Sequence, residues 1–200
     1  MTIDSFPIKV GGDIRAASCY WATPPGYSDT DRLKSWRGKE TARQQNAVEL
    51  AHLAASKWEA TCEWGTVASS IAEMKAVIRN DPEAEVTAMM LLAAKWSDDT
   101  VLGVCLFHRT WAGNVFLDFL AAHPRTQGEV KGVGTALLYS VCHVSTSLNA
   151  SILWGETASE SSSFYTAAFG LEDLHDRLVV PLETQRKFCR QLESKWRDLR

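Results

Sequence analysis

The segment from Glu129 to Leu138 has the residue pattern of an anion site. Its two glycines, Gly132 and Gly134, follow a strand-like run and stand at the expected start of a helix. Glycine has no Cβ, so the oxygens of a ligand can come close to the backbone there. The first turn of a helix also offers unpaired N–H groups and the positive end of the helix dipole. Together these features favour a bound phosphate, although a lone Gly-x-Gly also occurs in ordinary tight turns.

The first 80 residues are expected to form a loop-rich start followed by two helices. Apolar residues recur at spacings of three and four in residues 40–63 and again in 67–78, which predicts two helices, the second capped by Thr66. Residues 1–39 are rich in turn residues, and we expect loops with at most one strand, near Ile8 to Val10.

The elements around and after the glycines should form a sheet with helices packed on it. Three strand-like runs separated by turn residues predict an antiparallel meander: 86–96, 100–110 and 114–122. A helix with a buried stripe follows the glycines. The remaining expected elements are a strand at 151–155, a short helix at 159–169, a strand at 177–182 whose proline indicates a sheet edge, and a closing amphipathic helix.

Composition narrows the class of protein. The chain has 200 residues, 46% of them hydrophobic and 22% charged, which is typical of a soluble single domain. No apolar run is long enough to span a membrane, and a net charge of −3 makes nucleic acid an unlikely partner. Five cysteines without a Cys-x-x-Cys pair predict neither a metal site nor a disulfide framework. The start of the sequence lacks the charged-then-apolar pattern of a signal peptide, and we expect a cytoplasmic protein.

Two sequence segments resemble the Gcn5-related N-acetyltransferases (GNAT). The run Leu120-Ala121-Ala122-His123-Pro124, followed by Lys131-Gly132-Val133-Gly134-Thr135, is similar to the passage of that family from its central strand into the Arg/Gln-x-x-Gly-x-Gly/Ala loop. The segment from Phe164 to Leu171 is similar to the family's Phe-Tyr-x-x-x-Gly-Phe element. The resemblance implies an α+β fold: a mixed, mostly antiparallel central sheet flanked by helices.

The resemblance also implies how the chain is divided. We expect one acyl-coenzyme A N-acyltransferase domain over residues 1–200, in which 86–182 form the GNAT-like core and 183–200 a C-terminal helix. Residues 1–85 are an atypical, extended helical region that should lie on the acceptor side. That region would select the amine.

Acetyl-coenzyme A is the cofactor that the resemblance implies, as acyl donor and without a metal. Backbone amides from Val130 to Thr135 would bind the pyrophosphate, and the exposed end of the central strand would pair with the pantetheine amides as a short extra strand. Ser159 matches a polar family position near the coenzyme, or is simply a helix cap. The expected coenzyme contacts are Leu120, Ala121, Ala122, Glu129, Val130, Lys131, Gly132, Val133, Gly134, Thr135, Ser159 and Ser162.

Glu129 departs from the family pattern, which usually has Arg or Gln at this position. A carboxylate there repels phosphate unless it points away, and Lys131 is available to supply the compensating charge.

Two side chains are candidates for proton transfer in such a reaction. Asp118 is the only acid in the run 114–122, where a two-residue period places it on one face with Phe116 and Leu120. We expect it to act as a base or to bind the amine, although an ion pair or simple exposure would also explain it. Tyr165 is the expected acid for the leaving thiolate, because an ordinary tyrosine pKa of about 10 is near that of an alkyl thiol. An alignment on Gly170 instead puts Thr166 in that position.

Three functions remain open at this point. The first is acetyl or short-acyl transfer to an unspecified amine. The second is a catalytically silent acyl-coenzyme A sensor or interaction module. The third, a nucleotide-phosphate binder outside the family, lacks the Gly-Lys-Ser/Thr ending of a P-loop. The partners are thus acetyl-coenzyme A and an amine, with a homodimer left open.

Overall fold

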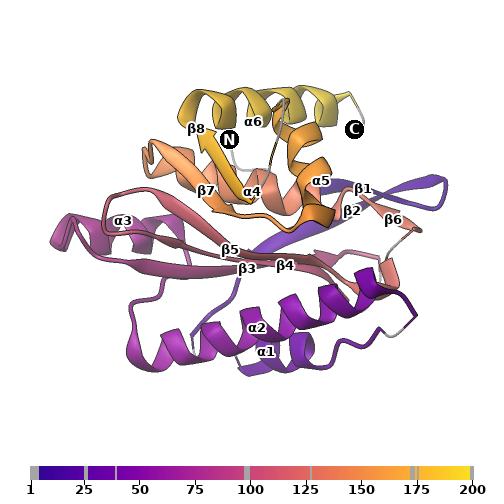
Figure 1. Ribbon diagram of the computed structural model, residues 1–200, viewed down its shortest axis with the longest axis horizontal. Helices are drawn as coiled ribbons and strands as arrows, with labels where there is room; N and C mark the ends of the chain where they lie inside the picture. Colours follow the sequence, from indigo (N-terminus) through magenta and orange to yellow (C-terminus); the bar gives the residue numbers. More distant parts are fainter. Residues whose placement is uncertain are drawn as a thin grey trace.

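In the computed structural model, the described residues are 5–24, 27–38, 40–96, 100–126, 128–171, 174 and 176–198. Within these residues, eight strands form one mixed sheet (Figure 1). The strands are β1 (Phe6–Val10), β2 (Asp13–Trp21), β3 (Val86–Ala94), β4 (Val101–Arg109), β5 (Val115–Ala122), β6 (Val130–Lys131), β7 (Ile152–Glu156) and β8 (Arg177–Pro181). Their order is β6-β1-β2-β3-β4-β5-β7-β8, and β5 and β7 run parallel whereas the other neighbours are antiparallel. The predicted α+β class with a mostly antiparallel sheet is therefore confirmed.

Helices cover both faces of the sheet (Figure 1). The described helices are α1 (Tyr27–Lys34), α2 (Ala42–Trp64), α3 (Ile71–Asn80), α4 (Val133–Ser147), α5 (Ser159–Phe169) and α6 (Leu182–Arg197). On one face, α1 and α2 bury a cluster around Trp58, Leu91 and Leu106. On the other face, α4 packs on β3, β4 and β5, and α6 lies over α4. Burial of apolar surface in these two clusters holds the helices to the sheet.

The N-terminal region is not the run of loops and helices that the sequence predicted. β1 and β2 form a hairpin through Gly11 and Gly12, and Gly11 has a φ of 59°, the left-handed conformation that tight hairpin turns need. The expectation of at most one strand is therefore wrong. The extended helical region is not confirmed either, because within the described residues this region supplies two strands as well as α1, α2 and α3.

The later elements follow the sequence pattern more closely. β3, β4 and β5 form the predicted meander, and β8 lies at an edge of the sheet, as Pro181 indicated. Helix α3, the second of the two helices predicted before the meander, starts later than predicted. Ser70 rather than Thr66 accepts the hydrogen bond that caps it. The Thr66 carbonyl instead accepts the Thr87 N–H, so the chain is still extended beside β3 at that point.

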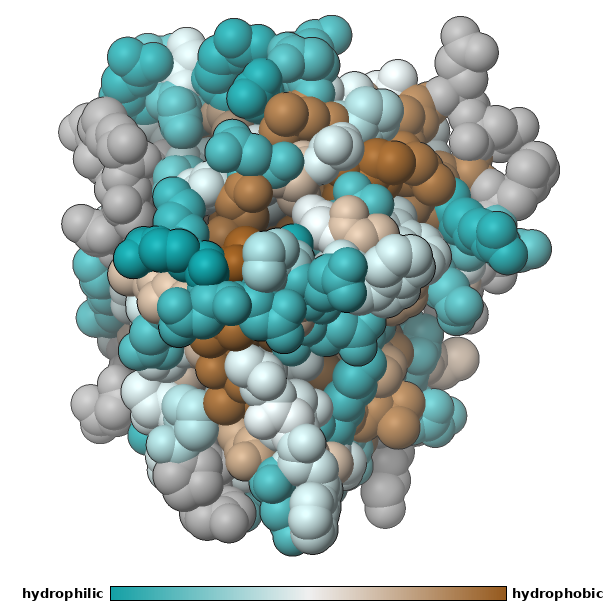
Figure 2. Space-filling view, turned by 90° about the vertical axis from the view of Figure 1, so that its left-hand side faces the viewer, coloured by the Kyte–Doolittle hydropathy of each residue, from teal (hydrophilic) through white to brown (hydrophobic). Residues whose placement is uncertain are grey.

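The surface is mixed in character. Figure 2 shows the α3 end of the molecule, where apolar residues are separated by hydrophilic ones. Among the described residues, the large apolar side chains that remain exposed are those of Ile14, Leu53, Trp64, Trp111, Trp154 and Val179. None of the helices in the described ranges is long and apolar enough to cross a membrane.

Candidate active site

The parallel strands β5 and β7 separate part of the way along the sheet. Their pairing runs from Val115 with Leu153 to Leu117 with Gly155, whereas β5 continues to Ala122. Beyond Leu117, the β7 side of β5 therefore has no strand partner among the described residues. A fork of this kind leaves backbone N–H and C=O groups that a bound extended molecule can pair with.

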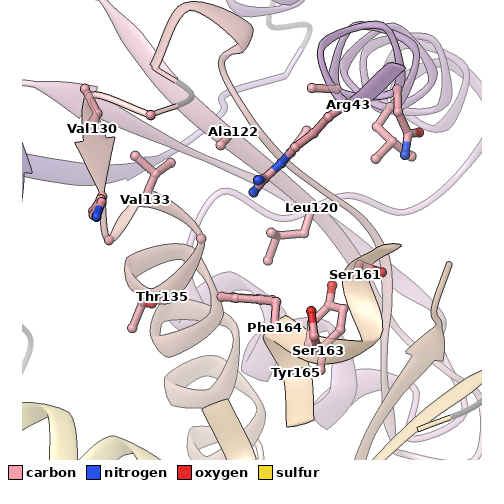
Figure 3. A pocket seen from close by; sticks show the side chains of 18 residues that line it. Arg43, Leu120, Ala122, Val130, Val133, Thr135, Ser161, Ser163, Phe164 and Tyr165 are labelled. Carbon is pink, nitrogen blue, oxygen red and sulfur yellow. The ribbon is translucent and has the colours of Figure 1, made fainter. Parts of the chain in front are cut away.

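A cavity of about 670 Å³ lies beside this fork (Figure 3). It is bounded by the end of β5, the start of α4, one face of α5 and the first turns of α2. Its lining residues are Arg43, Asn46, Ala47, Leu50, Leu120, Ala121, Ala122, Gly128, Val130, Lys131, Gly132, Val133, Gly134, Thr135, Ser161, Ser163, Phe164 and Tyr165.

The first turn of α4 forms one end of the cavity. Gly132 is the N-cap residue, with a φ of 100°, and it has no side chain that could accept a hydrogen bond from the helix N–H groups. The N–H groups of the first turn have no partner inside the helix. A helix start of this kind attracts an anion through those N–H groups and the helix dipole. Lys131 and Arg43 add two positive side chains to the lining.

The structure brings together most of the coenzyme contacts expected from the sequence. Leu120 to Ala122 and Val130 to Thr135 all line this one cavity. Glu129 does not line it: this residue borders a second hollow with Arg37 and Arg125, and its backbone carbonyl accepts the Gly11 N–H. The carboxylate therefore does not oppose a phosphate bound at α4.

The two predicted serine contacts stand differently. Ser162 does not line the cavity, although its neighbours Ser161 and Ser163 do. Its backbone carbonyl accepts the hydroxyl of Thr166 within α5. The side chain of Ser159 lies outside the described residues, so its predicted contact stays a prediction.

Arg43 is a cavity residue that the sequence analysis missed. It belongs to the first turns of α2, and Figure 3 shows its side chain extending across the cavity toward the start of α4. No motif marks Arg43, because its position follows from the packing of α2 against β5, far away in the sequence. The only local signal was its place at the beginning of a predicted helix.

Tyr165 lines the cavity from α5 and is 7% exposed. Burial, with a smaller contribution from Cys105, raises its pKa to about 12, so the hydroxyl stays protonated at neutral pH. No described residue shares a hydrogen bond with that hydroxyl, which leaves its proton for a ligand. Thr166 does not line the cavity, and its hydroxyl donates a hydrogen bond to the Ser162 carbonyl within α5.

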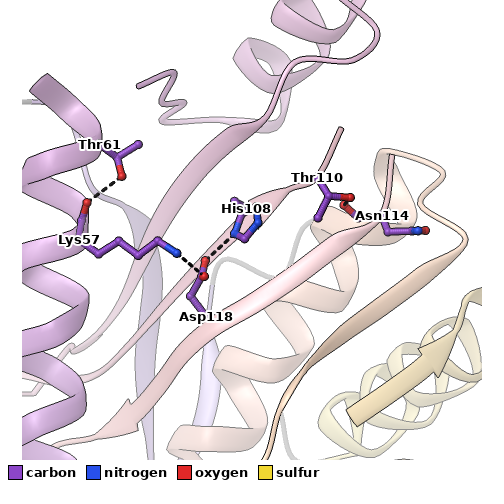
Figure 4. Close-up of polar contacts among 6 residues, drawn as sticks. All are labelled: Lys57, Thr61, His108, Thr110, Asn114 and Asp118. Carbon is purple, nitrogen blue, oxygen red and sulfur yellow. Dashed lines mark hydrogen bonds and ion pairs between the residues drawn. The ribbon is translucent and has the colours of Figure 1, made fainter. Parts of the chain in front are cut away.

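Asp118 lies in a polar chain on the α2 face of the sheet (Figure 4). One carboxylate oxygen accepts a hydrogen bond from Lys57 Nζ at 2.5 Å, and the other lies 2.8 Å from His108 Nδ1. The side chain of Asp118 is 4% exposed. Asp118 is therefore a buried carboxylate with a polar partner on each oxygen, and it lies next to the fork.

The predicted face of Asp118 is half wrong. The register between β4 and β5 jumps from Leu106 opposite Phe119 to Phe107 opposite Leu117, so Asp118 is the extra residue of a β-bulge. The bulge interrupts the two-residue alternation. Asp118 therefore shares its face with Phe116, through their common contact with His108, and not with Leu120, which packs on the α4 side.

Comparison with known proteins shows what the fold resembles. No family model matches the sequence, and no curated protein matches it either. Among solved structures, a point mutant of KacT has 13% identity and a TM-score of 0.54 over 86% of this chain and 98% of its own. A point mutant of the toxin AtaT, bound to the C-terminus of the antitoxin AtaR, has 16% identity and a TM-score of 0.53 over 86% and 96%.

A third similar structure is a protein from Desulfovibrio desulfuricans that is described as a putative acetyltransferase of the GNAT family. It is 16% identical, with a TM-score of 0.49 over 84% of this chain and 99% of that one. Identities this low show a shared fold alone. The chain has the GNAT-like fold that the two sequence segments implied.

Proposed function

We propose that this protein transfers an acetyl or other short acyl group directly from acyl-coenzyme A to an amine. The observation that carries the proposal is the fork past Leu117 and Gly155, which opens onto a cavity that ends at the uncapped start of α4. An extended pantetheine with a phosphate group at one end and a thioester at the other matches this arrangement of an open strand edge and an anion site.

The donor would lie lengthwise in the cavity, with its pyrophosphate at the start of α4 and its thioester at the fork. Its pyrophosphate accepts hydrogen bonds from the first-turn N–H groups of α4, between Gly132 and Thr135, with Arg43 and Lys131 balancing the charge. Its pantetheine amides pair with the free side of β5 from Leu120 to Ala122. The thioester then reaches the point where β5 and β7 part.

Tyr165 is the acid that this arrangement offers to the leaving sulfur. Its pKa of about 12 makes it a weaker acid than an ordinary tyrosine, because burial disfavours the phenolate. It would therefore act by donating a hydrogen bond to sulfur as negative charge develops there, and the proton would move as the C–S bond breaks.

None of the described residues that line the cavity is a cysteine, which supports direct transfer without an acyl-enzyme. Burial raises the pKa of the Cys105 thiol well above its usual range, so this residue of β4, which pairs with the lining residue Leu120 and does not itself line the cavity, stays a neutral thiol. Its neutral state supports attack by the amine itself on the thioester carbonyl.

Two measurements test the proposal. Calorimetry with coenzyme A, acetyl-coenzyme A and ATP should show binding of both coenzyme A compounds and not of ATP. Thiol release from acetyl-coenzyme A should then depend on an added amine, in a panel of polyamines, antibiotics, protein amines and aminoacyl-tRNA. The tRNA arm belongs in the panel because the expectation that nucleic acid is an unlikely partner has no support beyond the net charge.

The panel also separates the two surviving functions. Coenzyme A binding with no amine-dependent thiol release would support the silent binding module instead of the enzyme. Absence of coenzyme A binding would overturn both.

A further inference from the structure

A row of three aromatic side chains, one from each of β4, β5 and β7, lies next to the fork, and β8 borders the row. His108 of β4 lies opposite Phe116 of β5, which lies beside Trp154 of β7, which lies opposite Val179 of β8. The rings contact in sequence: His108 and Phe116 have centroids 5.3 Å apart, and Phe116 and Trp154 have centroids 4.5 Å apart. Trp154 is 36% exposed, so part of the row is open to solvent.

The row lies immediately beside the fork. The Phe116–Trp154 pair precedes the last β5–β7 pair, Leu117 with Gly155. The His108 ring contacts the carboxylate of Asp118, the first residue beyond the end of that pairing. The side of the sheet that carries this row is the α2 side, since Lys57 of α2 binds the same carboxylate.

Asp118 is poorly suited to take a proton from an amine itself. Both of its oxygens already have partners, and only 4% of the side chain is exposed. His108 is better placed, with 21% of its side chain exposed. When Nδ1 donates its hydrogen to Asp118, the neutral ring carries its lone pair on Nε2, and no described residue hydrogen-bonds that nitrogen.

We propose that His108 is the proton acceptor for the acceptor amine, that Asp118 orients it, and that the amine is a primary amine whose apolar or aromatic body rests on Phe116 and Trp154. This inference rests on the proposed acyl transfer and names the acceptor class and the base. It assigns Asp118 a positioning role, in place of direct contact with the amine.

The charges around His108 suit the neutral amine, which is the nucleophile. Among the described residues, the charged groups that these contacts place near the ring are Asp118 of β5, which contacts it, and Lys57 of α2, on the other carboxylate oxygen. Its register neighbours on the adjoining strands, Thr87 and Phe116, carry no charge. The Lys57 ammonium compensates the carboxylate and opposes a second ammonium, so it favours an unprotonated amine.

The transfer step balances with these groups. The amine nitrogen lone pair forms a bond to the thioester carbon, and the C–S bond breaks with its electron pair on sulfur. One proton from nitrogen passes to His108 Nε2 and from there to solvent. The thiolate takes its proton from Tyr165, which solvent reprotonates, so the products are the amide and the free thiol, with no net change in protons for a neutral amine.

The test uses the full chain with acetyl-coenzyme A and two amines, phenethylamine and methylamine. His108→Ala should lower kcat with phenethylamine by roughly 10²-fold or more while leaving coenzyme A affinity unchanged. The decline of activity toward low pH, where the base is protonated, should disappear in this variant. Added imidazole should raise the rate of this variant by roughly tenfold or more, because it fits the vacated space and replaces the base.

Further variants distinguish the proposed roles of His108, Asp118 and Trp154 from purely structural ones. His108→Gln keeps a hydrogen-bonding side chain without a titratable nitrogen, and it should be as slow as His108→Ala. Asp118→Asn should shift the acidic limb of the pH–rate profile and keep part of the activity, and Asp118→Glu should keep more of the activity than Asp118→Asn. Trp154→Ala should raise KM for phenethylamine and not for methylamine. The matched control is His143→Ala, on α4, whose ring stacks on Tyr139 away from the fork; imidazole should not change its rate.

The outcomes distinguish this inference from the proposed function. If the wild-type protein acetylates neither phenethylamine, methylamine nor any amine of the wider panel, the proposed function fails and the inference fails with it. If the wild type is active and His108→Gln keeps its rate and pH profile, only the inference is overturned. A folded His108→Ala protein that is slow but insensitive to imidazole, with its acidic limb intact, also overturns it.

Discussion

Leu117 and Gly155 form the last pair between β5 and β7, and the absence of a side chain at Gly155 makes their close approach possible. A Cβ at Gly155 would lie 2.8 Å from the Leu117 carbonyl oxygen, closer than real Cβ atoms come to backbone oxygen. The two strands are therefore in tight contact at the point where they begin to separate. This contact fixes where the fork starts.

Gly155→Ala should weaken both stability and catalysis. The new methyl group pushes against backbone, which cannot move aside as a side chain can, and overpacking of this kind costs about 1–3 kcal/mol. We expect a lower Tm together with a lower kcat, because the position of the thioester shifts. Gly12→Ala is the matched control, since a Cβ there meets no atom within 4 Å. Equal melting temperatures for the two variants would contradict the prediction.

Gly134→Val should lower coenzyme A affinity at least tenfold, or about 1.4 kcal/mol. A Cβ at Gly134 would lie 3.2 Å from the Phe164 ring, so the ring yields slightly, and the two methyl groups of valine block the approach of a phosphate to the first turn of α4. Calorimetry measures the affinity, with Gly12→Ala again as control. If a folded Gly134→Val protein binds coenzyme A as tightly as the parent, the anion site lies elsewhere.

The sequence predicted the elements whose residues repeat regularly. The meander and α4 were recognisable because their apolar residues follow the period of the element, and Gly132 and Gly134 mark the start of α4. β2 was missed because Asp13 to Ala16 are exposed and Ala17 alone is buried, which leaves no alternation to detect. The Gly11-Gly12 pair was a hairpin signal that the turn-rich surroundings concealed.

The site was predictable where it is local in sequence and not where it depends on packing. The cavity walls from β5, the glycine loop and α5 carry motifs, but Arg43 enters from α2 and has none. The face of Asp118 was misassigned because a two-residue period holds only in an unbroken strand, and the β-bulge lies at Asp118 itself. No residue type announces such a bulge in this sequence.

Arg43→Gln should weaken binding of acetyl-coenzyme A and not of acetyl-pantetheine, which has no phosphate. If the Arg43 guanidinium balances a phosphate at the start of α4, its loss removes a charge-assisted hydrogen bond of about 1.5–3 kcal/mol, or roughly tenfold to a hundredfold in affinity. The effect should shrink as salt is raised. Equal losses for the two donors would place Arg43 beside the pantetheine or the acyl group instead.

The fold should lose stability at alkaline pH partly through Tyr165. Burial raises the pKa of this tyrosine to about 12 in the folded protein, whereas in the unfolded chain it is about 10. The stabilisation is present in full below pH 10 and is lost as the pH rises toward 12, because the unfolded chain then releases its proton first. Denaturant unfolding at pH 8 and pH 11 should show a smaller decline for Tyr165→Phe, by roughly 1 kcal/mol. An equal decline in both proteins would contradict this.

Tyr165→Phe should slow acetyl transfer by roughly 10²-fold to 10⁴-fold while coenzyme A affinity stays nearly unchanged. The ring keeps its packing, so only the hydroxyl that faces the cavity is lost, and that group matters mainly as charge builds on sulfur. Thr166→Val is the matched variant: the Thr166 hydroxyl already donates to the Ser162 carbonyl and lies outside the cavity lining, so this change should be mild. Pre-steady-state thiol release with a saturating amine measures the chemical step in both. A severe loss in Thr166→Val with a silent Tyr165→Phe would mean that Thr166 occupies the catalytic position. Normal rates in both would mean that water protonates the thiolate.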